Sequence, residues 1–450
     1  MNLKELKNKT ILMFGKSRAF SDDEFMLQMK LHNIHVVKEY SDEVVLIVDG
    51  KMMTPYEDNE SVKLYEQKKA EFVDIDTLDK ALSNFLDEDT LLMSLKLSHD
   101  KDRLKGYLQN GMVSDALFLK LIKMYTWDGD DFFGNDDNRD ISAAFISRFY
   151  KNIERNHNVQ YSSRGFLHLI IQTTDEGLIE TVSLLEPLQK SFQADAEDSN
   201  YRIITAIATH YRTPKRVLKM LIKNSNSYVR TLIAMREDCD ESMQIQLFET
   251  DDEEVLRALS YNEKLNINLA LKLMKNKEYA KNIAKYINLD NRVFDMLYES
   301  SSLELAINNS IRYDMQKKLI DTNNIDIMTA LATNKYLHKD IFYELVAKKD
   351  ENINIAIYRN PSVQKTTLAK AYKNKKYYTS LASNENTPED ILQKLSQSED
   401  TAILLGLAKN PSTPIDVLYQ LQLDSRFERS VKENPTFGRH IQTENIGWQE

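Results

Sequence analysis

The sequence predicts a mostly α-helical protein: an α-helical solenoid of repeats of about 24–26 residues, preceded by a small α/β domain. Three observations predict this. A short phrase recurs at a fixed period through the second half of the chain, which is typical of stacked repeat units. The first 86 residues instead alternate short apolar runs with helical patterns. Glycine and proline number only 11 and 8 in 450 residues, as expected for a helical chain.

These patterns predict four regions along the chain. They are an α/β domain at 1–86, a helical region of diverged repeats at 87–200 with an acidic loop at 127–140, the repeat array at 201–440, and a C-terminal cap or tail at 441–450.

The first region has the expected order β-α-β-β-α-β-α. Strands are predicted at 10–14, 34–37, 44–48 and 71–73, and the third is apolar enough to lie centrally in a parallel sheet. Ser21 and Glu24 form a capping-box pattern ahead of a helix at 25–31. A second helix is expected around 60–69, and Asp74 or Asp76 would cap a last one.

This order, with Phe14-Gly15-Lys16 after the first strand, resembles a BRCT domain over about 78 residues. Members of that family mostly bind proteins, while some bind phosphopeptides and a subset binds DNA ends. The resemblance points to Gly15, Lys16, Ser17 and Lys63 as residues of a phosphate or peptide contact. Phosphate-binding members carry Ser or Thr where Phe14 stands here. The alternative is a module used only for protein contact or dimerisation.

The acidic loop at 127–140 permits three interpretations. Its 13 residues from Asp128 to Asp140 include six carboxylates, which suit a hard cation such as calcium. The spacing departs from an EF-hand, however, so we expect a solvated loop with Trp127, Phe132 and Phe133 packed against the helices, and no metal site. A partner-contact loop is the third interpretation. The stretch 110–121 fits the repeat pattern, so the solenoid is expected to begin near residue 90.

The recurring phrase occurs at 207–214, 381–388 and 407–414. In the last copy, Pro411 should end one helix, and Thr413 should cap the next with Pro414 in its first turn. Taking the Asn of the phrase as an anchor gives ten positions: His210, Arg236, Asn262, Asn288, Asn309, Asn334, Asn360, Asn384, Asn410 and Asn434. Stacked Asn side chains can bond to the turns of neighbouring units. The alternative is a ladder of ligand-binding amides.

The repeats resemble the leucine-rich repeat variant family, with HEAT-like repeats as the neighbouring possibility, over about 200–440. The resemblance implies units of about two dozen residues that pair an α-helix with a short 3₁₀ helix. Some members carry an iron–sulfur cluster on a group of cysteines. This chain has one cysteine, Cys239, which cannot hold such a cluster, and no cofactor is predicted. We expect Cys239 to be a small core residue rather than a nucleophile.

Composition bears on location and partners. One cysteine, no apolar run approaching 18 residues and no leader-like N-terminus predict a cytoplasmic protein with no membrane contact. The net charge is −10, which disfavours nonspecific nucleic-acid binding. The acidity is uneven: residues 87–200 contain 12 basic and 20 acidic side chains, while residues 201–450 contain 35 and 33.

One basic and aromatic segment is the strongest candidate for a nucleic-acid or partner contact, since lysines can hold phosphates and tyrosines can stack on bases. Its residues are Lys370, Tyr372, Lys373, Lys375, Lys376 and Tyr377. The alternative is a solvated helix end with Tyr372 in the core.

No set of residues in the sequence forms a recognisable catalytic motif. We therefore expect a noncatalytic interaction scaffold that binds a protein partner on the solenoid, with the N-terminal domain as a second contact. The alternative is a DNA-associated factor in repair or genome maintenance. A concave face lined by Lys and Arg would favour the alternative, and a mixed-charge or apolar face would count against it.

Overall fold

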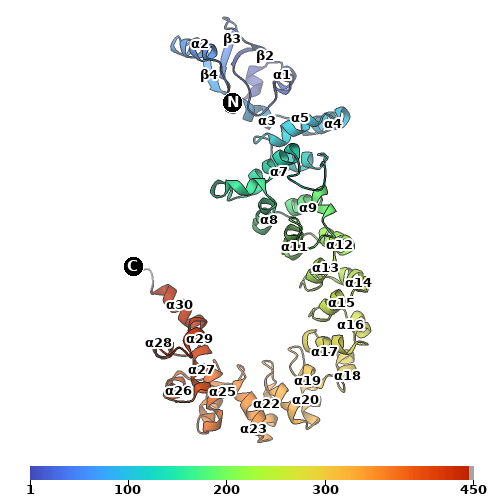
Figure 1. The fold of residues 1–450 in the computed structure, drawn as a ribbon, viewed down its shortest axis with the longest axis vertical. Coiled ribbons are helices and arrows are strands. Elements are labelled where there is room, and N and C mark those ends of the chain that lie inside the picture. Colours follow the sequence, from blue (N-terminus) through green and yellow to red (C-terminus); the bar gives the residue numbers. More distant parts are fainter. Residues whose placement is uncertain (445–450) are drawn as a thin grey trace. The chain divides into compact units, whose positions relative to one another are not determined.

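The computed structural model describes residues 1–444, so the predicted cap or tail at 441–450 lies mostly outside the described residues. Within 1–444 the chain forms thirty α-helices and one four-stranded sheet, which confirms a mostly α solenoid and a small α/β domain (Figure 1). The chain divides into two compact units, 1–233 and 234–450. No helix in the described part of the chain is long and apolar enough to cross a membrane.

The α/β domain is built on a parallel sheet of order β2-β1-β3-β4. Ile11, Leu12, Ile47 and Val48 on the two central strands are fully or almost fully buried, as predicted for a sheet that is covered on both faces. Its elements are the 3₁₀ helix η1 (Leu3–Leu6), β1 (Thr10–Phe14), α1 (Asp22–Leu31), β2 (His35–Val37), β3 (Val44–Asp49), α2 (Pro55–Glu66), β4 (Glu71–Asp74) and α3 (Ile75–Asn84).

Two helices of this domain begin earlier than predicted. Ser21 caps α1, which starts at Asp22 rather than residue 25. Helix α2 starts at Pro55 rather than near residue 60, because Thr54 and Glu57 form a reciprocal capping box with a proline in the first turn. Asp74, one of the two predicted caps, accepts the N–H of Thr77 at 2.8 Å and begins α3.

The rest of the first unit is helical and has an aromatic core. Phe118, Phe132, Phe145 and Phe166 have no exposed surface, and Phe145 lies 5.4–5.5 Å from Phe118 and Phe166 between ring centroids. The elements are α4 (Glu88–Ser98), α5 (Lys101–Gln109), α6 (Asp115–Ile122), α7 (Asp136–Phe149), η2 (Ile153–Arg155), η3 (His157–Tyr161), α8 (Ser163–Gln172), α9 (Glu176–Ser183), α10 (Glu186–Lys190), α11 (Tyr201–Thr209) and α12 (Lys215–Asn224), followed by α13 (Ser227–Ala234), whose last residue opens the second unit.

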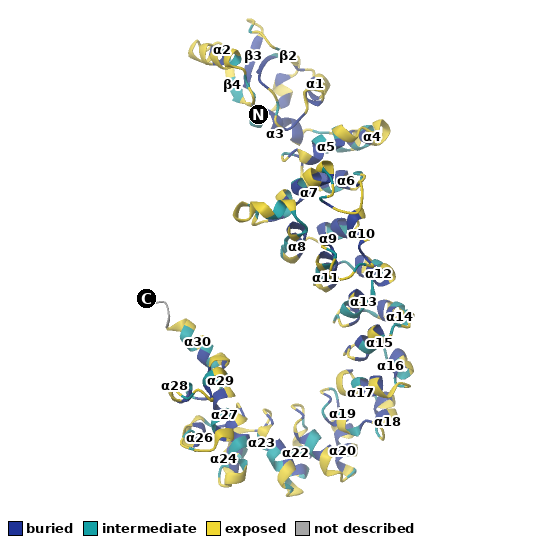
Figure 2. Ribbon diagram, viewed as in Figure 1, coloured by how far each residue is buried: buried dark blue, intermediate teal, exposed yellow. Residues whose placement is uncertain are grey.

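The second unit consists of short helices in two layers. Each odd-numbered helix packs on the next odd-numbered one, from α15 to α29, and the buried faces lie between the layers (Figure 2). The helices are α14 (Glu241–Phe248), α15 (Glu253–Ser260), α16 (Ile267–Leu273), α17 (Lys277–Tyr286), α18 (Asn291–Leu297), α19 (Ser302–Ala306), α20 (Tyr313–Asp321), α21 (Ile325–Ala332), α22 (Lys339–Ala347), α23 (Glu351–Arg359), α24 (Lys365–Ala371), η4 (Lys375–Tyr377), α25 (Tyr378–Ser383), α26 (Glu389–Leu395), α27 (Thr401–Lys409), α28 (Ile415–Gln422), α29 (Glu428–Lys432) and α30 (Pro435–Thr443).

A ladder of buried asparagines joins successive repeats of this unit. The side-chain amide of Asn360 donates to the carbonyls of Ala332 and Asn334, at 2.8 Å each, and its Oδ1 accepts the N–H of Ser362. The same pattern connects one turn to the previous one at six further positions: Asn262, Asn308, Asn334, Asn384, Asn410 and Asn434. These amides are buried and hydrogen-bonded to the protein itself, which supports the structural interpretation over a ligand-binding ladder.

The predicted register was wrong at two anchors. The ladder residue is Asn308, which bonds to the carbonyls of Ala284 and Ile287, whereas Asn309 is exposed. Asn288 is not a ladder residue either. The carbonyl that accepts the next ladder amide, from Asn308, belongs to Ile287 and not to Asn288. The register was ambiguous in the sequence because two asparagines are consecutive at 308 and 309. Helix α17 also runs to Tyr286, so Ile287 and not Asn288 directly follows it.

The predicted capping role of Thr413 was also wrong. Pro414 is the N-cap of α28, and the Thr413 hydroxyl instead donates to the carbonyl of Leu407 at 2.7 Å. Thr213 and Thr387 make the same bond to Ile207 and Leu381. The threonine of the phrase therefore adds a side-chain hydrogen bond to a carbonyl at the end of the preceding helix, where intrahelical partners run out.

Candidate functional site

The loop after β1 carries three of the four residues predicted for a phosphate contact. Gly15 has φ +62°, and a Cβ there would lie 2.4 Å from the carbonyl oxygen of Lys51, so only glycine fits. Its N–H donates to Glu57 Oε1 at 3.2 Å. A carboxylate from the start of α2 thus already occupies the amide that a phosphate would use.

A second carboxylate fills the rest of this loop. The Ser17 hydroxyl donates to Asp79 Oδ1 at 2.8 Å, and the amides of Arg18 and Ala19 both donate to Asp79 Oδ2 at 3.1 Å. Asp79 is fully buried, and burial raises the pKa of its carboxyl against the lowering effect of these hydrogen bonds. The loop is an anion-binding turn that the protein satisfies with its own side chains.

The two predicted lysines make ion pairs of their own. Lys16 contacts Asp22 at 2.7 Å, and Lys63 contacts Glu60 at 2.7 Å on the exposed side of α2. The structure therefore places Gly15, Lys16 and Ser17 in one loop, and the described contacts do not join Lys63 to it. These pairings weaken the phosphopeptide hypothesis.

The basic and aromatic segment lies at the turn between α24 and α25. Lys370, Lys373, Lys375 and Lys376 are exposed, and Lys376 pairs with Glu351 at 2.7 Å. The tyrosines are occupied by other side chains: Tyr372 stacks on Tyr378 at 4.9 Å, and Tyr377 contacts Tyr358 at 4.7 Å between ring centroids. Tyr372 is half-buried rather than in the core. Each of these rings therefore already contacts another ring, which reduces the surface available for base stacking.

The acidic loop folds around a buried asparagine. The Asn138 side chain donates to the carbonyls of Asp128 and Asp131, at 2.7 and 3.1 Å, and has no exposed surface. Trp127 and Phe132 are buried, as predicted, and Phe133 is half-buried. No group of three His, Cys, Asp or Glu side chains in residues 1–444 is placed to hold a metal ion.

Cys239 lies in the core of the second unit at 3% exposure. Burial, and next the nearby carboxylates of Asp240 and Asp238, raise the pKa of its thiol to about 12. The thiol therefore stays protonated near neutral pH, which agrees with the core interpretation.

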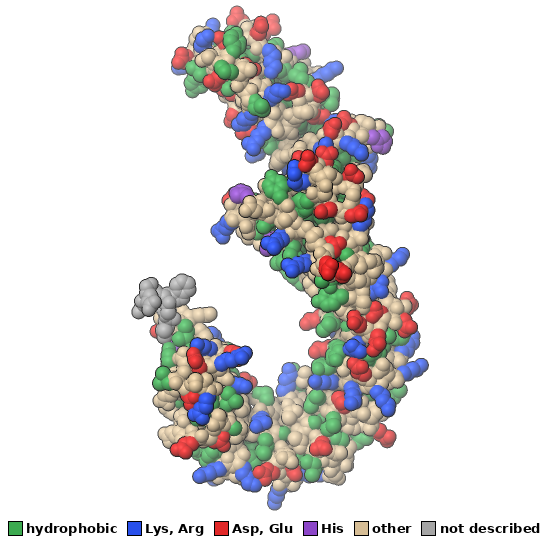
Figure 3. Space-filling model, viewed as in Figure 1, with side chains coloured by type: hydrophobic (Ala, Val, Ile, Leu, Met, Phe, Trp, Pro, Cys, Tyr) green, Lys and Arg blue, Asp and Glu red, His purple; other side chains and the backbone are tan. Residues whose placement is uncertain are grey.

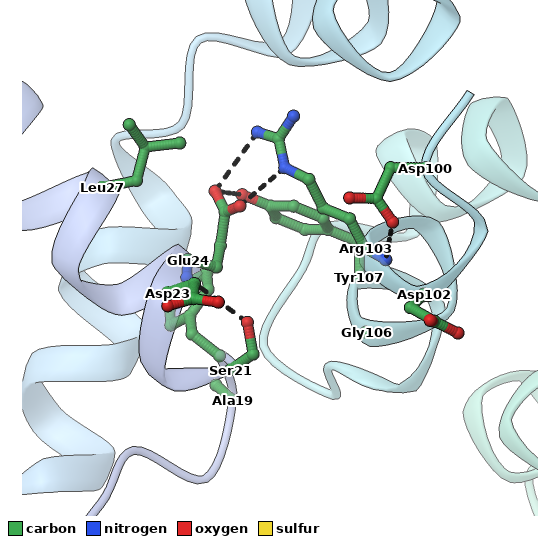
Figure 4. Close-up of a pocket in the computed structure, with 11 residues that line it drawn as sticks. Ala19, Ser21, Asp23, Glu24, Leu27, Asp100, Asp102, Arg103, Gly106 and Tyr107 are labelled. Carbon is green, nitrogen blue, oxygen red and sulfur yellow. Dashed lines mark hydrogen bonds and ion pairs between the residues drawn. The ribbon is translucent and has the colours of Figure 1, made fainter. Parts of the chain in front are cut away.

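Helix α1 meets α5 through a buried polar network that the sequence did not reveal (Figure 4). Arg103 Nε donates to Glu24 Oε2 at 2.6 Å, and Arg103 also donates to Ser94 Oγ at 2.7 Å. The Gln28 amide donates to Glu24 Oε1 at 2.7 Å, and the Tyr107 hydroxyl donates to the same oxygen. Glu24 thus faces α5 instead of closing a capping box with Ser21.

The network fixes the charges of its members. Burial alone would raise the pKa of Glu24, but the hydrogen bonds from Arg103, Tyr107 and Gln28 outweigh it and lower that pKa. Burial, and next the hydrogen bond to Glu24, raise the pKa of the Tyr107 hydroxyl. The ionised carboxylate and the neutral phenol are therefore the stable forms, and beside them lies an open cleft of about 500 Å³.

The second unit carries a row of residues at one repeated position, directly before each turn of the ladder, and all of them are exposed except the half-buried Ile307. We call it the terminal row, because each member lies at the C-terminal end of an odd-numbered helix. Its members are Met235, Tyr261, Tyr286, Ile307, Thr333, Arg359, Ser383, Lys409 and Glu433. The first four are apolar or aromatic and the last five are polar, so the row changes character along the unit.

Tyr261 and Tyr286 show that the row is continuous across repeats. Their rings lie 5.2 Å apart although they belong to consecutive units, and they are 39% and 38% exposed. Met235, at the preceding position, is 62% exposed. The sequence did not predict this row. The repeated pattern is carried by the buried anchor residue, whereas the residue before it varies from unit to unit.

Comparison of the chain with protein-family models, with curated proteins and with solved structures finds no match.

Proposed function

We propose that this chain is a noncatalytic interaction scaffold whose second unit binds a protein partner along the terminal row, with the α/β domain as a second contact. The contact between the exposed rings of Tyr261 and Tyr286 carries the proposal. Aromatic side chains expose a large area at low conformational cost and dominate the energetics of protein interfaces. Met235 and Ile307, on either side of the pair, extend the apolar surface.

The asparagine ladder supports this function by making the surface rigid. Each buried amide ties one turn to the previous turn, so the residue directly before it is held in a defined place. A surface that is already ordered loses little entropy when a partner binds. A repeated surface also lets a partner contact several units at once.

The charges of the second unit favour a protein over DNA as the partner. Several odd-numbered helices carry an acid in the first turn, such as Glu253, Glu278 and Glu351, and only part of the terminal row is basic. Figure 3 shows acidic, basic and hydrophobic side chains interspersed on this unit. DNA binding is dominated by clustered lysines and arginines, so this mixture counts against the alternative function in genome maintenance.

Affinity purification of the tagged full-length protein from the cell that makes it, with nuclease treatment, tests the proposal. We expect a stoichiometric protein partner that survives nuclease and is lost from the Tyr261→Ser/Tyr286→Ser variant. The matched control is Tyr313→Ser/Tyr343→Ser, which removes two tyrosines of similar or greater exposure outside the terminal row. Loss of every partner on nuclease treatment, or equal loss from both variants, would contradict it.

A further inference from the structure

The cleft beside the Glu24 network is lined partly by apolar side chains and is open beside a glycine of α5. Leu27 of α1 is 41% exposed, although it is a leucine on a helix that packs against the rest of the domain. Phe20 and Tyr107 also line the cleft. Gly106 of α5 also lines the cleft, and a Cβ added there would meet no atom within 4 Å, so the space beside it is open. The volume of about 500 Å³ is in the range of side-chain and ligand pockets.

Carboxylates surround the mouth of this cleft. Asp23 lies on α1, while Asp100 and Asp102 lie at the start of α5 (Figure 4). Arg103 is the one cation among the described lining residues, and Glu24 already neutralises it at 2.6 Å. Lys105, which does not line the cleft, pairs with Asp102, and Asp23 and Asp100 still leave the mouth negative.

We propose that this cleft binds a lysine or arginine side chain of a partner protein together with the apolar residue beside it. The cationic head would pair with Asp23 and Asp102, and the aliphatic stem would lie on Leu27. The inference rests on the proposed role of the α/β domain as a second contact, and it names the chemistry that this contact takes.

The arrangement suits an extended cation better than a compact ion. Asp100 already caps α5 by accepting the N–H of Arg103 at 3.0 Å, and Asp102 lies 3.0 Å from Lys105. A metal ion needs several oxygens converging on one point. A long side chain needs instead a charged rim and an apolar wall, which Asp23 and Leu27 supply.

Fluorescence anisotropy with the full-length chain tests this site. The probe is a fluorescein-labelled hexapeptide of alternating lysine and leucine, and the control peptide replaces lysine with glutamine. We expect the lysine peptide to bind, and to bind at least about fivefold more weakly to Asp23→Asn/Asp102→Asn, because each rim ion pair contributes modestly. Gly106→Leu, which places a large side chain in the open space of the cleft, should also weaken binding.

The matched control is Asp58→Asn, which removes an exposed acid from the first turn of α2, outside the cleft, and should leave affinity unchanged. Equal binding by all three variants, equal binding of the glutamine peptide, or binding of spermidine in place of the peptide would overturn the proposal. The Tyr261→Ser/Tyr286→Ser variant must keep full peptide affinity, because it alters only the second unit. A failure of the cleft and a failure of the terminal row are therefore distinguishable.

Discussion

The two units hold their neighbouring elements together by different means. In the first unit, α1 and α5 are joined by one charged network, in which Glu24 accepts hydrogen bonds from Arg103, Tyr107 and Gln28. In the second unit, a neutral amide makes the same two bonds to backbone carbonyls at turn after turn. A contact made once depends strongly on each of its members, whereas a repeated contact spreads the stabilisation over many equivalent residues.

The charged network should show the largest effect of a single substitution. Arg103→Met leaves the carboxylate of Glu24 buried without its cation, which costs about 3 kcal/mol of the unfolding free energy. The ion pair is mostly buried, with side-chain exposures of 17% and 7%. Urea unfolding, with hydrogen exchange of peptides from α1 and α5, measures the loss.

Arg139→Met is the matched control, because Arg139 pairs with Asp136 on the surface at 48% exposure. It should cost less than about 0.5 kcal/mol. Equal effects of the two substitutions would show that the network does not hold α1 against α5.

The ladder should show a smaller effect at each position, and one that depends on register. Asn308→Ala leaves the carbonyl of Ala284 without a side-chain donor and that of Ile287 with only the hydroxyl of Ser310, and it should cost about 2 kcal/mol. The neighbouring Asn309→Ala alters an exposed residue and should change stability by less than about 0.5 kcal/mol. Urea unfolding of the two variants in parallel compares them directly. A larger loss for Asn309→Ala would restore the register that the sequence suggested.

Acid should distinguish the charged α1–α5 network from the neutral asparagine ladder. The pKa of Glu24 is lowered in the folded state, so its contribution to stability is present above about pH 4.3, the ordinary pKa of glutamate, and is lost as pH falls through the folded value. The pKa of Asp79 is raised, so its protonation on acidification acts in the opposite direction. The ladder amides do not titrate.

Urea midpoints between pH 7 and pH 3.5 test this expectation, with hydrogen exchange used to assign each transition. Acid should destabilise the α1–α5 junction of the unsubstituted protein, and Glu24→Gln should remove that part of the pH dependence. An unchanged pH profile in Glu24→Gln would assign the effect to other carboxylates.

The smallest effect on stability is expected at the terminal row. Tyr286→Ser removes a ring that is 38% exposed and should lower the unfolding free energy by about 1 kcal/mol or less, mainly through lost contact with Tyr261. Urea unfolding gives this value. A loss comparable to that of Asn308→Ala would mean that the row stabilises the fold rather than presents a surface.

The sequence predicted what recurs and what is patterned locally. The strands of the α/β domain, the central place of β3 and the position of most ladder asparagines followed from apolar runs and from the repeated phrase. The start of α2 was missed although Thr54, Pro55 and Glu57 form a cap, because the apolar pattern of that helix begins later.

The contacts made once could not be predicted. Glu24 is four residues from Gln28 but 79 from Arg103, and nothing in a single sequence pairs residues so far apart. The same holds for Asp79, which reaches the loop of Ser17 from 62 residues away. The terminal row is periodic in the structure, but its residue types change along the unit. No amino acid therefore recurs at that position to mark the row in the sequence.

Photo-cross-linking tests the proposed function most directly. A photoreactive residue is placed, in separate variants, at positions 286 and 261 of the terminal row. A third variant carries it at position 343, an exposed tyrosine of α22, as the control. After irradiation in the native cell and nuclease treatment, we expect the same protein adduct from 286 and 261 and none from 343. Adducts to nucleic acid, or a protein adduct from 343 alone, would contradict a scaffold that binds its partner along this row.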